Sequence, residues 1–336
     1  MERRSRRSPP GFPRRGVTLL ELLVVLTLIA SLLGIGVGIA SRLTFGRGAA
    51  IEMVRDVLQA ARAYAVAQGS PARVLALREG RAIQRTGLRP IGGWHFEGDG
   101  TEGAFSLKLD LRGARVVEEG RIGSALSFEE GGFAEAPVGS LSAWSTRDGF
   151  GFEADVRVDH GGGIVARRGE SWKLEVRGDG SVGADVTLVS ATKGEEVRGE
   201  RLRVETVPGL VLEGRWARLG LFYDRLHLRL SVDGVERARS RRARERVWLD
   251  PSPLRLSDPE RTFHGAVDEV RVSSVVADEP RVLPDGVEFG QDLLEIRFDA
   301  AGNLDPSFHD GPVSVGLLYD GGARRAVEVG SYGTLR

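Results

Sequence analysis

Glu21 is the residue whose chemistry is least expected from its surroundings. It lies in a segment, Val17 to Ala40, in which every other side chain is apolar or small apart from two threonines and one serine. A carboxylate inside a bilayer costs at least a few kcal/mol, so an acid retained there indicates a function. The chemistry open to Glu21 is pairing with a cation, because a buried charge is tolerated once an opposite charge neutralises it.

The segment that holds Glu21 has the length and the flanks of a membrane span. Its 24 residues would form a helix of roughly 36 Å, which crosses a hydrocarbon core. Residues 1–16 contain six arginines and one acid, Glu2, and should remain cytoplasmic. Three other interpretations are open: a plain signal anchor, a secretory signal cut after Ala40, and a core helix of a soluble protein. None of these three explains Glu21.

The sequence around Glu21 resembles the class III signal of type IV pilins and type II secretion pseudopilins. It reads RGVTLLELLVV from Arg15 to Val25. The resemblance implies that a membrane prepilin peptidase cleaves between Gly16 and Val17 and that Val17 is then methylated. It also implies that Glu21 and Thr18 serve filament assembly, with Glu21 pairing with an N-terminal ammonium. Val17 departs from the family, in which phenylalanine or methionine is more usual.

A helical pattern continues beyond the apolar segment and stops at Gly69-Ser70-Pro71. We therefore expect one helix from Val17 to about Gln68, with an amphipathic second half that carries a globular domain. Short alternating strands are expected at 72–78, 81–85, 294–298, 313–319 and 326–329. These two ends of the chain resemble the H-type minor pseudopilin of type II secretion, or its type IV pilus counterpart. Phe298 with Gly302, and Gly333 with Arg336, fit that family's pattern loosely.

The middle of the chain has many short alternating strands with regular turns and no helix pattern, which predicts a β-sandwich. It resembles the concanavalin A-like jelly roll of the laminin G superfamily in four ordered motifs. These are GRIGSALSF from Gly120, the Trp216 to Asp224 segment, LRLSVDG from Leu228, and FHGAVDEVR from Phe263. Ser231 replaces the tyrosine that is usual in the third motif.

Together these patterns predict an α+β fold with an insertion. A long N-terminal helix would pack on a small antiparallel pseudopilin domain, interrupted by an all-β jelly roll. The predicted boundaries are a leader at 1–16, helix and first pseudopilin part at 17–91, jelly roll at 92–278 and C-terminal pseudopilin part at 279–336. Insertion suits a domain whose termini lie close together.

Paired carboxylates would be needed for a glycosidase, as in some related jelly rolls. Glu153-Ala154-Asp155 begins such a pattern, but Val158 occupies its last position, and the adjacent Asp268 and Glu269 should point to opposite faces. We therefore expect no enzymatic activity. The resemblance to laminin G domains makes calcium possible, with Asp224, Asp233 and Asp268 as weak candidates that are better read as turn and fold residues. We expect no other cofactor, since the five histidines show no ligand spacing and cysteine is absent.

The remaining features bear on partners. Lys plus Arg and Asp plus Glu both total 47, which does not indicate a nucleic-acid partner. Exposed tryptophans could stack on a sugar, although burial is the more ordinary fate of Trp94, Trp144, Trp172 and Trp248. The basic run Arg237 to Arg246 could bind an acidic partner or be a solvated loop.

The sequence thus predicts a non-enzymatic minor pseudopilin of a type II secretion or type IV pilus-like system. It would sit in the inner membrane with its globular part outside the cytoplasm, at the filament tip when assembled. Its expected partners are the prepilin peptidase, other pilins through the N-terminal helix, and a glycan or protein ligand of the jelly roll. The alternative is a carbohydrate-binding or carbohydrate-active surface protein that is merely anchored by its N-terminus.

Overall fold

The computed structural model describes residues 24, 26, 48–97, 108–136, 146–192 and 195–336. Val24 and Leu26 are helical and about half exposed. The rest of the predicted span lies outside the described residues, as do Gly16, Val17, Thr18 and Glu21. Among the residues that are described, no helix is long and apolar enough to cross a membrane.

Residues 48–68 form a helix that buries one stripe of small and aliphatic side chains. Ala50, Val54, Leu58, Ala61 and Ala65 are fully buried, at the three- and four-residue spacing of one helix face. The helix ends where predicted, because Gly69 adopts the left-handed conformation (φ 55°) and Ser70 N donates to the carbonyl of Ala65. That hydrogen bond satisfies one of the carbonyls left free at the helix end.

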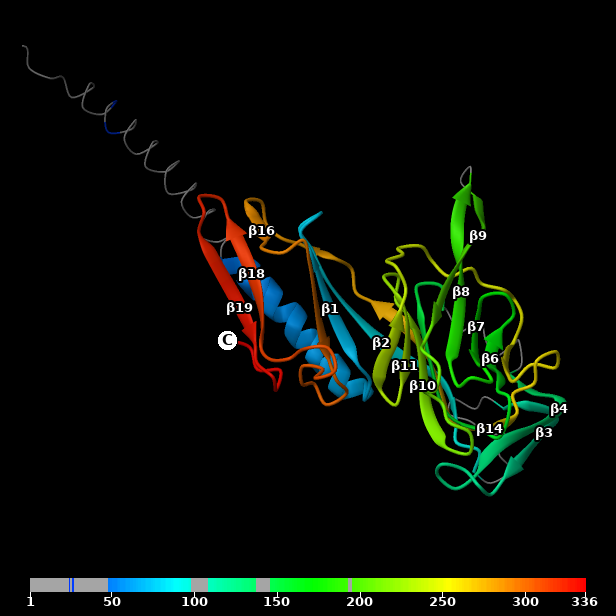
Figure 1. Cartoon of the computed structure of the whole chain (residues 1–336). Coiled ribbons are helices and arrows are strands. Elements are labelled where there is room, and N and C mark those ends of the chain that lie inside the picture. Colours follow the sequence, from blue (N-terminus) through cyan, green and yellow to red (C-terminus); the bar gives the residue numbers. More distant parts are fainter. Residues whose placement is uncertain (1–23, 25, 27–47, 98–107, 137–145, 193–194) are drawn as a thin grey trace, which may run out of the picture.

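The helix stripe shares a hydrophobic core with strands from both ends of the chain. In one sheet β1 (Ala72–Leu77) pairs antiparallel with β17 (Leu293–Phe298) and with β2 (Ala82–Trp94), which also pairs with β15 (Arg281–Val282). A separate three-stranded sheet contains β16 (Val287–Phe289), β18 (Val313–Tyr319) and β19 (Arg324–Val329). We call this group, seen at the upper left of Figure 1, the helix-bearing unit.

A second hydrophobic core lies inside a β-sandwich, which we call the jelly roll. Its strands follow one another around the sandwich in the order β12-β11-β10-β5-β14-β4-β13-β6-β7-β8-β9, with β3 paired to β4. They are β3 (Asp110–Val117), β4 (Ala125–Glu135), β5 (Phe150–Val158), β6 (Gly163–Arg168), β7 (Trp172–Val176), β8 (Val182–Thr192), β9 (Glu195–Glu205), β10 (Trp216–Tyr223), β11 (Leu228–Val232), β12 (Val235–Arg239), β13 (Leu254–Leu256) and β14 (Gly265–Ala277). Leu228, Leu230 and Val232 are buried as the alternation predicted, and Asp233 and Gly234 form the tight turn with φ of 52° and 78°.

Two long strands connect the units. β2 and β14 have 13 residues each and pair with each other from Val270 opposite Trp94 to Ala277 opposite Thr86. β2 therefore extends well past the short return strand predicted at 81–85, and the predicted boundary at residues 91–92 falls inside it. Figure 1 shows β2 running from the helix-bearing unit into the jelly roll. The units share a continuous sheet rather than a loose linker.

The predicted α+β class is wrong. The described part of the chain holds one continuous helix, residues 48–68, against nineteen strands, so its fold is mainly β. The predicted helix start at Val17 lies outside the described residues, and the described helix that packs on the sheet spans only residues 48–68. One helix is enough to cover the sheet of the helix-bearing unit. The other described elements of that unit, and all those of the jelly roll, are strands.

Candidate functional site

The two units meet at a network of charged side chains. Strand β1 contributes Arg73, whose neighbours along the strand, Ala72 and Val74, face the helix. Because side chains alternate along a strand, Arg73 faces away from the helix and toward the jelly roll. We define the interface network as Arg73, Glu295 and Arg297 of the helix-bearing unit with Asp224, Arg229, Glu236 and Arg239 of the jelly roll.

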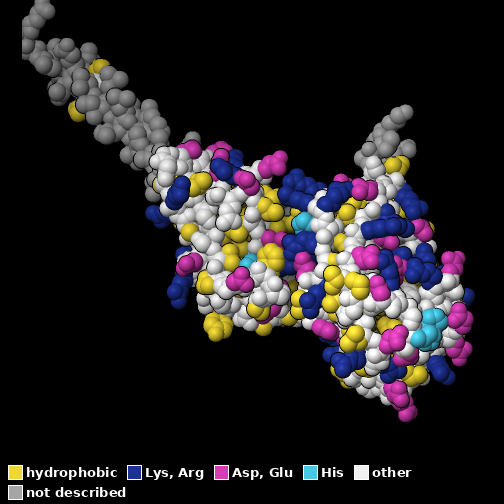
Figure 2. All heavy atoms as spheres, viewed as in Figure 1, with side chains coloured by type: hydrophobic (Ala, Val, Ile, Leu, Met, Phe, Trp, Pro, Cys, Tyr) yellow, Lys and Arg dark blue, Asp and Glu magenta, His cyan; other side chains and the backbone are white. Residues whose placement is uncertain are grey.

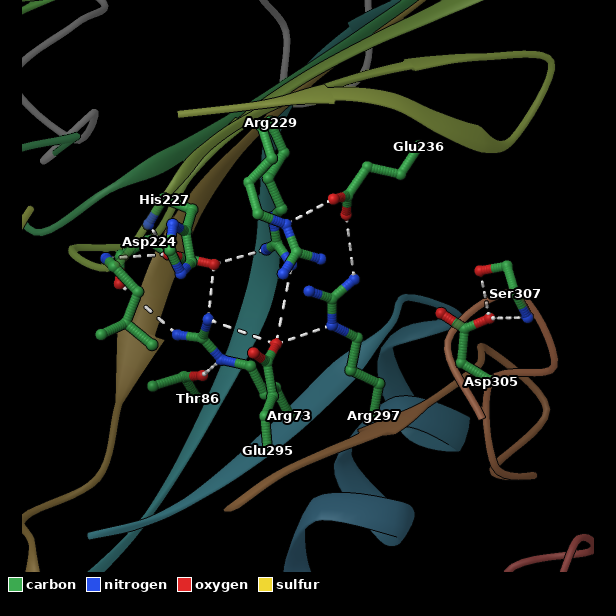
Figure 3. Close-up of polar contacts among 12 residues, drawn as sticks. Arg73, Thr86, Asp224, His227, Arg229, Glu236, Glu295, Arg297, Asp305 and Ser307 are labelled. Atoms are coloured by element: carbon green, nitrogen blue, oxygen red, sulfur yellow. Dashed lines mark hydrogen bonds and ion pairs between the residues drawn. The ribbon is translucent and has the colours of Figure 1, made fainter. Parts of the chain in front are cut away.

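Asp224, directly after β10, lies at the centre of this network (Figure 3). Its Oδ2 accepts a hydrogen bond of 2.5 Å from Arg73 Nη1 and a second one from Arg229. Its Oδ1 accepts the backbone N–H groups of Leu226 (3.0 Å) and His227 (3.1 Å). Both carboxylate oxygens of Asp224 are thus bonded, and the residue is buried.

Glu295 and Glu236 complete the network on either side of Arg297. Arg297 Nε donates to Glu295 Oε1 at 2.6 Å, and Arg297 Nη1 donates to Glu236 Oε2 of the jelly roll at 3.3 Å. Arg239 Nε donates to the other oxygen of Glu236 at 2.5 Å. Figure 2 shows dark-blue Lys and Arg side chains gathered where the two units meet.

Electrostatics keep the network ionised. Burial alone would raise the pKa of Asp224, but Arg229, Arg73 and the two backbone N–H groups hold it well below its usual range. The pKa of Glu295 is likewise raised by burial and more than offset by Arg73, Arg297 and Arg229, so it lies below its usual value. Burial lowers the pKa of Arg73 against the opposing effect of Asp224. The charges are stable as a group because each carboxylate has more than one cationic neighbour.

Two cavities adjoin this interface. One, of about 320 Å³, is lined from both units, by Arg73, Leu88 and Arg297 on one side and by Phe222, Arg229 and Glu236 on the other. The second, of about 390 Å³, lies between the helix end at Gln68 and the jelly-roll residues Arg218, Glu269 and Arg271. Glu153 borders both cavities. Burial raises the pKa of Glu153 against the opposing effects of Arg271 and Arg218.

The three aspartates that were weak metal candidates do not come together. Asp224 is held by arginines, and Asp233 accepts the backbone N–H of Arg218 at 2.9 Å in its turn. Asp268 is buried and accepts the N–H groups of Ile122 (3.1 Å) and Glu269 (2.7 Å). Burial raises the pKa of Asp268. Among the described residues, no group of three or more His, Asp or Glu side chains is placed to hold a metal ion.

The carboxylates considered for catalysis are also separated by their partners. Glu153 and Asp155 share the outer face of β5, but Arg218 holds Asp155 with hydrogen bonds of 3.1 and 2.7 Å. A bulge in β14 places Glu269 in the left-handed conformation (φ 49°), and its side chain contacts His95 at 3.0 Å. Neither β5 nor β14, both fully described, therefore carries a matched pair of free carboxylates.

The tryptophans and arginines that were candidates for ligand binding are mostly buried in the core or paired with acidic residues of the protein. Trp94 and Trp172 are buried in the jelly-roll core, Trp248 is half-buried, and Trp144 lies outside the described residues. Within the basic run, Arg239, Arg241, Arg244 and Arg246 each have an acidic partner. The run is therefore largely neutralised by the protein itself.

Sequence reasoning missed most of the interface network. Arg73 in "ARVLAL" and the pair Glu295 and Arg297 in "LLEIRF" fall in strands that the sequence predicts, but no partner is predicted for them. The available signal is an arginine at the second position of an otherwise apolar strand, because a buried arginine is costly unless it is paired.

Two stretches of the chain match known families. Residues 123–282 match the concanavalin A-like lectin/glucanases superfamily, and residues 12–37 match the prokaryotic N-terminal methylation motif. The chain thus combines a prepilin-type N-terminal motif with a concanavalin A-like domain, which confirms both resemblances at this level. No curated protein matches the chain.

Several solved structures resemble the fold. Domain 4 of AbnA, a GH43 extracellular arabinanase from Geobacillus stearothermophilus, is 12% identical, with 56% of this chain and 93% of that chain covered and a TM-score of 0.41. The binding domain of botulinum neurotoxin DC is 8% identical, with 55% and 47% covered and a TM-score of 0.38. Trypanosoma rangeli sialidase is 14% identical, with 54% and 30% covered and a TM-score of 0.37. This chain spans less than half of the toxin domain and of the sialidase, and at such scores the likeness bears on neither binding nor catalysis.

Proposed function

We propose that this chain is a non-enzymatic, prepilin-type subunit that displays a jelly-roll binding module. The prepilin peptidase cleaves it after Gly16, Val17 is methylated, and the mature helix holds the subunit in the inner membrane and then in a filament. The filament belongs to a type II secretion or type IV pilus-like system, in which the chain is a minor pseudopilin of the H type. The observation that carries this proposal is the methylation motif at residues 12–37.

The arrangement of the two units supports the proposal that the subunit displays its jelly roll from a filament. The β2–β14 pairing and the interface network join the jelly roll to the unit that contains helix 48–68. A subunit whose helix is fixed in a filament therefore holds its jelly roll in a fixed orientation. The globular part would lie on the extracytoplasmic side.

Binding without catalysis is supported by the state of the carboxylates. Asp155 is committed to Arg218, and Glu153 has no second free carboxylate beside it on β5. Hydrolysis of a glycosidic bond requires two such groups at a defined separation. The second candidate function, an anchored carbohydrate-binding or carbohydrate-active surface protein, is favoured by the match to the lectin/glucanases superfamily.

Assembly through Glu21 separates the two candidates. We expect Glu21→Gln to be inserted and cleaved but not to co-isolate with other pilin-type subunits after crosslinking in cells. Glu52→Gln, which changes an exposed acid on the described helix, is the matched control and should co-isolate normally. Equal co-isolation of wild type and Glu21→Gln would favour the plain anchored surface protein instead.

A further inference from the structure

The cavity of about 320 Å³ between the two units combines an apolar wall with charged groups. Its apolar wall includes the half-buried ring of Phe222, together with Leu88 and Val275. The Phe222 ring lies over Gly151 and Gly220, where a Cβ atom would come within 3.1 and 2.7 Å of ring carbons. Two glycines therefore allow the ring to lie against the sheet, with room for a ligand above it.

Two arginines of the interface network line one side of this cavity. Arg229 and Arg297 both line it, and Arg229 Nε and Arg297 Nη2 have no acceptor among the described residues. Buried guanidinium N–H groups without a partner are uncommon in native proteins and call for one. A carboxylate is one of the groups that match guanidinium geometry.

Anionic acceptors remain free on another side. Asp305 lines the cavity and uses only Oδ1 for its hydrogen bonds, to Ser307 N (2.9 Å) and Ser307 Oγ (2.6 Å). Glu153, on the jelly-roll side, accepts no hydrogen bond within the described part of the chain. In Figure 3 Asp305 and Ser307 lie beyond Arg297 and share no drawn contact with the interface network.

The count of charges favours a ligand that carries an ammonium as well as a carboxylate. The interface network has four arginines and three carboxylates, while Glu153, Asp299 and Asp305 add three more carboxylates to the cavity lining. Asp299 Oδ1 already accepts hydrogen bonds from the backbone N–H groups of Ala301 and Asn303. A simple anion would face this acidic excess, and a simple cation would face the guanidinium groups of Arg229 and Arg297.

We propose that this cavity binds a zwitterion with an apolar body, namely a free amino acid. Its carboxylate pairs with Arg229 and Arg297, its ammonium pairs with Asp305 or Glu153, and its side chain lies on Phe222. The volume is within the range of small-ligand pockets. Because the lining comes from both units, neither unit contains the site alone. The proposal goes beyond the proposed assembly and does not depend on it.

Calorimetric titration of the detergent-extracted full chain tests this site. L-leucine should bind with an affinity at least about tenfold greater than that of leucinamide, which lacks the carboxylate, and of N-acetylleucine, which lacks the ammonium. Cellobiose, a neutral hydroxylated ligand of larger size, should not compete. Binding of cellobiose with displacement of leucine would overturn the zwitterion assignment in favour of a sugar site. No heat from leucine at millimolar concentration, or equal binding of the three leucine compounds, would also overturn it.

Asp305→Asn is the variant that tests location. Asparagine can still accept the Ser307 hydrogen bonds, so the loop is preserved, while the ammonium partner is removed. We expect leucine affinity to fall about tenfold or more. Asp310→Asn changes an exposed acid that does not line the cavity, and this variant should bind leucine as wild type does. Unchanged binding in Asp305→Asn, with its thermal unfolding also unchanged, would place the ligand elsewhere and contradict the proposal.

Discussion

Arg73 on β1 and Asp224 at the end of β10 are joined by a hydrogen bond of 2.5 Å, although they stand 151 residues apart in the chain. One belongs to the helix-bearing unit and the other to the jelly roll, and both side chains are almost completely buried. The pair fixes the orientation of the jelly roll relative to the helix-bearing unit, because separating the two units would leave both buried charges unpaired at a high cost in free energy.

Removing one member of this pair should destabilise the protein strongly. We expect Asp224→Ala to lower the free energy of unfolding by about 3–5 kcal/mol, since it leaves Arg73 and Arg229 buried without their shared acceptor. Urea unfolding followed by circular dichroism measures the change. Asp148→Ala, which removes a half-exposed partner of Arg225 and Arg246, is the control and should cost about 1 kcal/mol or less. Equal losses in the two variants would contradict a central role for Asp224.

Two classes of carboxylate predict opposite dependences of stability on pH. The pKa values of Asp224 and Glu295 are depressed in the folded protein, so their contribution is present above the unfolded pKa near 4 and is lost as the pH falls through the folded values. The pKa of Glu153 is raised, so its contribution is present below about pH 4 and is lost as the pH rises through the folded value.

Glu153→Gln isolates the second effect. A neutral side chain removes the burial penalty of the carboxylate, so the variant should be more stable than wild type at pH 7 and should gain nothing at pH 3. Thermal unfolding at a series of pH values provides the comparison. A variant less stable than wild type at pH 7 would show that ionised Glu153 is held by a favourable contact.

Gly220 on β10 should not tolerate a side chain. A Cβ atom there would clash with Ser231 Oγ and approach the Phe222 ring to 2.7 Å. We expect Gly220→Ala to cost about 1–3 kcal/mol through displacement of these neighbours. Gly316→Ala on β18 is the matched control, since its Cβ would meet nothing within 4 Å. Chemical denaturation of both variants measures the change in the free energy of unfolding. No change in Gly220→Ala would mean that the Phe222 ring moves aside freely.

The end of helix 48–68 depends on the conformation of Gly69. Its φ of 55° is unfavourable for any residue with a Cβ, so Gly69→Ala should cost about 1–2 kcal/mol even though the space around it is open. Val66→Ala, one turn earlier and exposed, should change stability by about 0.5 kcal/mol or less. Helix content and the unfolding midpoint are the measurements, and a neutral Gly69→Ala would be inconsistent with this helix end.

Local patterns in the sequence predicted individual elements better than their assembly. The helix stop at Gly69, the alternation of β5 and the Asp233-Gly234 turn follow from rules that act over a few residues, and the structure has them. The predicted α+β class was wrong because it counted the single helix as a major part of the fold, although both units consist mainly of strands. Arg73 signals by itself that it needs a partner, but Asp224 could not be identified as that partner, since the two residues meet only through the pairing of strands remote in sequence.

The intact mass of the membrane-extracted protein, measured for wild type beside Gly16→Ala, tests the central claim most directly. Prepilin-type processing predicts a wild-type chain that begins at methylated Val17 and a mutant in which this species is lost. A wild-type chain that begins at Met1, or at Ser41 after removal of a secretory signal, would contradict the proposed function.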